Sequence, residues 1–124
     1  MDFSRPVLLD TNVLIDVISG RFDVEAFAKI ELMYVSAVSV AEVFALAGMS
    51  TKEESEINTF LKGIDVVPLS ERIARSAGGM SRTRRKLTPD IMIAATAIAL
   101  GVPVVTRDVK GFRNIPGLAV VPMR

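Results

Sequence analysis

The stretch Val7–Asp16, VLLDTNVLID, decides the fold of this chain, because a short aliphatic run ends on a carboxylate and continues as a helix. The run Pro6–Leu9 is typical of a strand that is buried on both faces, and apolar residues follow at helical spacing over 13–17. Asp10 therefore lies at a strand-to-helix corner. Ligands bind outside the carboxyl ends of parallel strands, although a single Asp at such a corner is also a good helix cap.

Composition limits what this corner can do. The 124 residues are enough for one domain with a real core, over residues 1–124. Cysteine and histidine are both absent, which excludes disulfides, a cysteine nucleophile, a histidine base and a typical zinc site. A catalytic metal would then be a hard ion with oxygen ligands, such as Mg²⁺ or Mn²⁺. The net charge of +1 implies no partner by itself.

Hydropathy raises the question of a membrane location, since half of the residues are hydrophobic and the mean hydropathy is +0.42. The apolar stretch 32–49 contains Glu42, whose burial in lipid would be costly. The stretch 91–105 contains Gly101 and Pro103 and is shorter than the roughly 20 residues that a span needs. Residues 1–5 do not begin a signal peptide. We therefore expect a cytoplasmic protein without a membrane-spanning segment.

Strand and helix patterns alternate along the rest of the chain. Aliphatic runs predict further strands at 32–37, 64–69, 102–106 and 118–121. Periodic and capped segments predict helices at about 24–31, 39–47, 51–62, 70–82 and 88–100, and a loop or single helical turn at 107–114. The Gly78-Gly79 pair is expected to fray or bend the helix at 70–82. This alternation predicts an α/β fold with a parallel sheet.

Four acids are predicted to share one edge of this sheet, because parallel strands all end at the same edge and the helices that return antiparallel to them begin there. They are Asp10 after the first strand, Glu42 after the second, Asp90 in the first turn of the helix before the fourth, and Asp108 just past that strand. Each acid also has a structural interpretation. The segment Ser39–Glu42 fits a capping box, Asp90 suits the helix dipole, and Asp108 suits a turn.

Together, the four acids indicate a metal site. Carboxylates that lie within several ångströms of one another cannot all ionise unless a cation offsets the repulsion or their pKa values rise. One or two divalent ions would balance the charge and would prefer oxygen ligands. Such a site activates water and stabilises the charge on a phosphodiester during in-line displacement, so phosphoryl chemistry is its natural use.

Several segments of the chain resemble the PIN-domain ribonucleases, in particular the small VapC-type toxins of bacterial and archaeal toxin–antitoxin pairs. The matching segments are LDTN at 9–12 with LID at 14–16, SVAEV at 39–43, PDIMIAATA at 89–97, and VTRD at 105–108 with Phe112. The resemblance covers nearly the whole chain and implies a single PIN-like domain, a three-layer α/β/α sandwich around a parallel sheet of four or five strands. It also implies endonucleolytic RNA cleavage with one or two Mg²⁺ or Mn²⁺ ions, by a homodimer that a cognate antitoxin neutralises.

The same resemblance assigns roles to individual residues. The family's catalytic and metal-binding quartet corresponds to Asp10, Glu42, Asp90 and Asp108. Thr106, Asn12 and Asp16 correspond to supporting residues, Asp16 being more than a helical turn and a half beyond Asp10. Many relatives have a further acid just before the phenylalanine of the last segment. This chain has Gly111 there, which puts a second metal ion in doubt.

Basic residues flank two of the four acids. Arg82, Arg84, Arg85 and Lys86 directly precede the helix of Asp90, and Arg107 precedes Asp108. A run of charges is often just the solvated end of a helix. The functional interpretation is contact with RNA phosphates, which would position RNA without reading its sequence.

Other interpretations remain open at this point. The apolar residues Phe44, Leu46 and Met49 belong to the core, or to a surface for dimerisation or for an antitoxin. A phosphoacceptor regulator also gathers acids at the edge of a parallel sheet, but its paired acids after the first strand are missing here. A catalytically inactive PIN-like module that binds only RNA or protein would share the fold.

Overall fold

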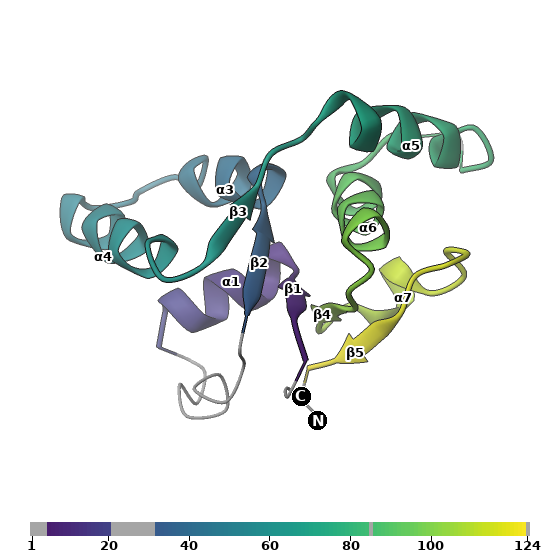
Figure 1. The fold of residues 1–124 in the computed structure, drawn as a ribbon. Helices are drawn as coiled ribbons and strands as arrows, with labels where there is room; N and C mark the ends of the chain where they lie inside the picture. The colour runs from purple at the N-terminus through teal and green to yellow at the C-terminus, as the bar shows by residue number, and fades with distance from the viewer. Residues whose placement is uncertain (1–4, 21–31, 85, 124) are drawn as a thin grey trace.

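The computed structural model describes residues 5–20, 32–84 and 86–123, and shows an α/β chain (Figure 1). Its strands are β1 (Val7–Leu9), β2 (Met33–Ser36), β3 (Asp65–Val67), β4 (Val104–Thr106) and β5 (Val120–Pro122). Its helices are α1 (Thr11–Ile18), α3 (Ala37–Phe44), α4 (Thr51–Leu61), α5 (Glu71–Ser81), α6 (Pro89–Leu100) and the short α7 (Val109–Phe112). The helix predicted at 24–31 lies outside the described residues.

The five strands form one parallel sheet in the order β3-β2-β1-β4-β5. The first strand is therefore central, and Leu9 pairs in register with Val35 of β2 and Val105 of β4. The next residues along these three strands are Asp10, Ser36 and Thr106, which stand side by side at the carboxyl edge. The strand register thus places polar side chains next to one another at the point where the sheet ends.

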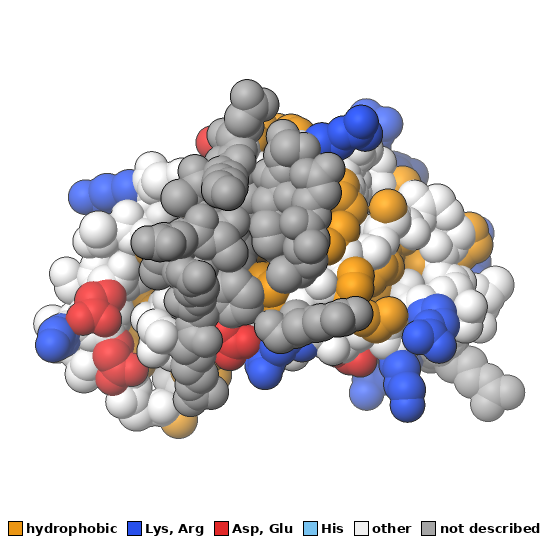
Figure 2. All heavy atoms as spheres, turned by 90° about the horizontal axis from the view of Figure 1, so that it is seen from below, with side chains coloured by type: hydrophobic (Ala, Val, Ile, Leu, Met, Phe, Trp, Pro, Cys, Tyr) orange, Lys and Arg blue, Asp and Glu red, His pale blue; other side chains and the backbone are white. Residues whose placement is uncertain are grey.

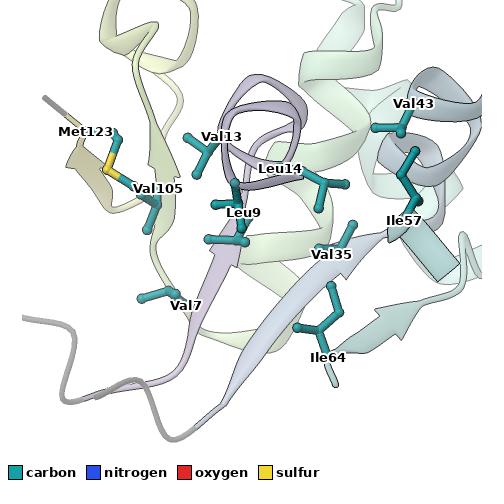
Figure 3. Packing of buried hydrophobic residues seen from close by; sticks show 11 residues of the cluster. Val7, Leu9, Val13, Leu14, Val35, Val43, Ile57, Ile64, Val105 and Met123 are labelled. Carbon is teal, nitrogen blue, oxygen red and sulfur yellow. The ribbon is translucent and has the colours of Figure 1, made fainter. Parts of the chain in front are cut away.

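Alternate residues of β1 face opposite helical layers. Val7 and Leu9 pack against α1, α3 and α4, in a cluster that includes Val35 and Val105 (Figure 3). Leu8 packs on the other face with residues of α6 and α7, such as Ile93. These side chains are at most 1% exposed, and burying one of this size stabilises the fold by about 1.5–3 kcal/mol. The predicted three-layer α/β/α sandwich is confirmed.

Helix α6 has the boundaries that its sequence predicts. The Thr88 hydroxyl accepts a hydrogen bond from the Ile91 N–H at 3.3 Å, and Pro89 occupies the first helical position. Gly101 ends the helix with a φ of 69°, a left-handed conformation that favours glycine. The ends of α6 are thus fixed by local chemistry. Among the described residues, no helix is long and apolar enough to cross a membrane.

Two helical predictions are wrong. Helix α3 begins at Ala37 with Ser36 as its cap, so Ser39 lies inside the helix, and the capping box that its spacing with Glu42 suggested does not form. Helix α5 runs without a break through the Gly78-Gly79 pair. The reason is tertiary packing: Ile73 and Ala77 of α5 are buried against α6, which stabilises the helix beyond what local propensity predicts.

Candidate active site

Asp10 is the most enclosed of the four predicted acids, at 3% exposure. It occupies the N-cap position of α1, and its Oδ1 accepts a hydrogen bond from the Thr11 N–H at 2.7 Å. Its Oδ2 accepts a hydrogen bond from the Thr106 hydroxyl at 2.8 Å, across from β1 to β4. Both carboxylate oxygens are therefore fixed by donors, and the cap and site interpretations of Asp10 are compatible.

Glu42 is held by a short chain of hydroxyl groups. The Thr11 hydroxyl lies 2.7 Å from Glu42 Oε1 and 2.8 Å from the Ser39 hydroxyl. Since each hydroxyl has one proton, both bonds form together when Ser39 donates to Thr11 and Thr11 donates to Glu42. The sequence pattern did not predict either hydroxyl residue as part of the site. The only signal was their place in the two matched segments, with Thr11 directly after Asp10 and Ser39 three residues before Glu42.

Asp108 lies at the end of β4, next to Thr106. Its N–H donates to the Thr106 hydroxyl at 2.9 Å, so this hydroxyl links the backbone of one acid to the side chain of another, Asp10. The exposed Asp108 carboxylate caps α7 by accepting a hydrogen bond from the Gly111 N–H at 3.1 Å. A Cβ at position 111 would lie 2.5 Å from Asp108 Oδ2, so glycine there permits this conformation.

Asp90 is the second residue of α6. We call Asp10, Glu42, Asp90 and Asp108 together the acidic corner. Burial raises the pKa of the Asp90 carboxyl above its ordinary value of 3.8, and the charges of Asp10, Asp108 and Glu42 raise it further. Burial likewise raises the pKa of Asp10. The hydrogen bonds from Thr106 and Thr11 oppose that rise, while Glu42 and Asp108 add to it. The four acids therefore share one electrostatic neighbourhood.

The four acids are not arranged as a preformed metal-binding site. In the part of the chain that the structure describes, no three of them stand close enough together to hold a metal ion. Their chemistry nevertheless fits a hard divalent cation, because every donor is an oxygen. Neighbouring negative charges raise the pKa of both Asp10 and Asp90, and a cation would reverse that effect.

Two of the predicted basic residues contact other parts of the chain. Arg84 Nη2 donates to the Asn114 carbonyl at 3.0 Å, and Arg107 Nε pairs with Asp16 Oδ2 at 2.8 Å. Arg82 and Lys86 are exposed, and Arg85 lies outside the described residues. The contact of these residues with RNA phosphates stays a prediction.

The two predicted supporting residues on α1 differ in exposure. On the face that Figure 2 shows, seen from below the view of Figure 1, the described acidic and basic side chains lie at separate places. Asn12, predicted as a supporting residue, is exposed on the first turn of α1. Asp16, by contrast, is 4% exposed and points to Arg107. Its ion-pair partner, Arg107, lies in the loop that follows β4.

Comparison with known families identifies the class of this fold. The model of the PIN domain matches residues 7–118, from β1 to the segment before β5, and this range includes all four acids. The chain therefore belongs to the PIN-domain family. This membership sets aside the phosphoacceptor interpretation.

Individual relatives narrow the class further. Ribonuclease VapC10 of Mycobacterium tuberculosis is 34% identical over 115 residues, which cover 86% of this chain and 85% of the relative. Ribonuclease VapC2 of Rickettsia felis is 27% identical over 124 residues, covering 90% and 92%. The prediction that this is a PIN domain of the VapC type is confirmed.

Solved structures support the same fold. The crystal structure of VapBC2 from Rickettsia felis, bound to a DNA fragment from their promoter, matches with a TM-score of 0.80 at 22% identity, covering 96% of this chain and 99% of that chain. A toxin–antitoxin complex from Klebsiella pneumoniae matches with a TM-score of 0.73 at 28% identity, covering 93% and 95%. The predicted PIN-like architecture is confirmed over nearly the whole chain.

Proposed function

We propose that the protein is a metal-dependent endoribonuclease and the toxin of a toxin–antitoxin pair, acting on RNA in the cytoplasm. The observation that supports this most directly is the common electrostatic neighbourhood of Asp10, Glu42, Asp90 and Asp108 at the carboxyl edge of a PIN-domain sheet. The names of the relatives, VapC ribonucleases, point to the same reaction.

The four acids are the proposed ligands of one or two Mg²⁺ or Mn²⁺ ions. When bound, such an ion supplies an activated water and stabilises negative charge on the phosphodiester. The chain itself contributes orientation: Thr106 and the Thr11 N–H fix both oxygens of Asp10, and the Thr11 hydroxyl fixes Oε1 of Glu42. Glu42 Oε2 accepts no hydrogen bond from the described residues, so it is the proposed free oxygen toward the cation.

A protein partner is part of the proposal, because the solved relative from Klebsiella pneumoniae is a toxin–antitoxin complex. A groove of about 230 Å³ lies between α1 and the α3–α4 turn, and its apolar lining includes Ile15, Ile18, Leu46 and Met49. Leu46 is 46% exposed, and nearby Phe44 is 37% exposed. The groove is also lined by Ser19 and Glu53, and its apolar part suits an apolar side chain of the antitoxin. The homodimer is likewise proposed, by resemblance to the family.

The test is cleavage of a mixed RNA substrate by the purified protein, with Mg²⁺ or Mn²⁺ and then with a chelator. Cleavage should require the ion and should be lost in Asp90→Asn, while Arg75→Ala, in an exposed ion pair with Glu71, serves as the control. Cleavage that persists in Asp90→Asn, or that ignores the chelator, would refute the proposal. The alternative, an inactive PIN-like binding module, predicts no cleavage and no metal-dependent thermal shift.

A further inference from the structure

The ion pair between Asp16 and Arg107 joins a buried carboxylate to a half-exposed guanidinium. The Asp16 side chain is 6% exposed and the Arg107 side chain is 52% exposed, with 2.8 Å between Asp16 Oδ2 and Arg107 Nε. The other described ion pair, Glu71 with Arg75, has side chains that are 83% and 78% exposed. A surface pair such as that one contributes little to stability. The buried Asp16 is different, because its carboxylate loses hydration on folding.

The burial of Asp16 is not fully compensated by contacts. Its Oδ1 is a buried oxygen with no hydrogen-bond partner. A buried acceptor without a donor is unfavourable, and an apolar residue of similar size would often be at least as stabilising. Fold stability alone therefore explains Asp16 poorly, and the position of its partner offers a better reason.

In the sequence, Arg107 lies between two residues of the candidate site, Thr106 and Asp108. It directly follows Thr106, which donates to Asp10, and directly precedes Asp108. Asp16 engages the Nε side of the guanidinium, and the described residues give its two terminal amino groups no partner. A guanidinium held by one edge can present its remaining N–H groups to a phosphate in a fixed geometry.

We propose that Asp16 is a positioning residue that orients Arg107 to bind an RNA phosphate beside the acidic corner. The proposal rests on the proposed function in taking RNA as the ligand. Asp16 acts only through Arg107, which contacts the phosphate next to the one that is cleaved. Asp16 therefore has a role in RNA binding, whereas the four acids have a role in cleavage.

The test measures RNA binding in the Asp10→Asn background, so that no cleavage occurs during the titration. The probe is a single-stranded RNA oligonucleotide followed by fluorescence anisotropy over a range of salt concentrations. Asp16→Asn should weaken binding about tenfold and should reduce the slope of log affinity against log salt by about 0.7, the value for one phosphate contact with a single strand. Arg107→Ala should do the same, and Arg75→Ala should change neither quantity.

The double variant Asp16→Asn/Arg107→Ala distinguishes positioning from a purely structural role. If Asp16 acts through Arg107, the double variant binds no more weakly than Arg107→Ala alone. Additive losses, or an unchanged salt slope in Asp16→Asn, would overturn the inference even if the wild type cleaves RNA. Binding that depends on both residues in a protein that never cleaves RNA would refute the proposed reaction and leave this inference standing. A parent that binds no RNA overturns both.

Discussion

Strands β1 and β4 are each followed by an aspartate of the acidic corner, Asp10 and Asp108. The two side chains differ in exposure and in the number of hydrogen bonds that they accept. Asp10 and Asp108 both occupy helix N-cap positions. Asp10 is 3% exposed and both of its oxygens accept hydrogen bonds, whereas Asp108 is exposed and its Oδ1 accepts one from Gly111. The central strand therefore presents a fixed carboxylate, and the neighbouring strand presents one that can turn.

This difference teaches how a small sheet can build a charged site. A buried carboxylate is costly, so it is placed where the backbone and a threonine hydroxyl already supply donors. The exposed carboxylate has little desolvation cost and can move toward a ligand. Three substitutions and one change of pH test this contrast.

The largest expected effect is that of Asp10→Asn. We expect cleavage to fall by at least about 1,000-fold, because the proposed central ligand of the cation loses its charge. Thermal stability should stay the same or rise slightly, since one charge leaves a crowded cluster. Cleavage assays and thermal denaturation check both parts. Unfolding of the variant would mean that the cap role of Asp10 dominates.

Asp108→Asn should reduce cleavage less, by about 100-fold, because water replaces an exposed carboxylate ligand, the role proposed for Asp108, more readily than a buried one. Its stability should not change, since Asn caps a helix as well as Asp does. Asp108→Ala should add a loss of about 1 kcal/mol in the free energy of unfolding. Equal losses of cleavage and equal stability changes for Asp10→Asn and Asp108→Asn would contradict the contrast.

Thr106→Val removes the hydroxyl that joins the two strand ends. Asp10 Oδ2 loses its donor and the Asp108 N–H loses its acceptor, so we expect about 10-fold to 100-fold slower cleavage. The free energy of unfolding should fall by about 1–3 kcal/mol, because buried polar groups lose their partners. Thr106→Ser keeps the hydroxyl and should stay close to the wild type in both measurements.

The smallest expected effect is a pH dependence of stability. The pKa values of Asp10 and Asp90 are raised in the folded state above 3.8, so the folded protein binds protons more readily than the unfolded chain. Without metal, stability should therefore fall as the pH rises from about 4 through the raised pKa values, and then level off. Denaturation curves with and without Mg²⁺ check this, since the ion should reduce the fall. A metal-free protein that gains stability over this range would contradict the assignment.

Local chemistry made most of the fold predictable. Helix α6 has its cap, its first-position proline and its terminal glycine within one segment, so its ends could be read directly. The start of α3 could not, because Ser36 and Ser39 are both good caps. The choice between them depends on the strand: Ser36 pairs in register with Val67 at the end of β2, so the helix must begin there.

The candidate site, like the fold, could be predicted only in part. The order of strands and helices predicts that four acids meet at one edge, because parallel strands end together. The contacts of Thr11 with Ser39 and of Asp16 with Arg107 could not be predicted, since they depend on how far α1 is rotated about its axis against α3 and β4. Sequence spacing gives the face of a helix but does not give this angle to the accuracy of a hydrogen bond.

The central position of β1 has a consequence for synthesis of the protein. The hydrogen bond between Asp10 and Thr106 joins residues 96 positions apart, and β1 pairs with both β2 and β4. During translation, Asp10 emerges before Thr106, and its neighbours on β4 are made only after α6. The acidic corner therefore cannot assemble on a ribosome that has reached only α6. A growing chain therefore lacks the complete site until β4 and Asp108 have emerged.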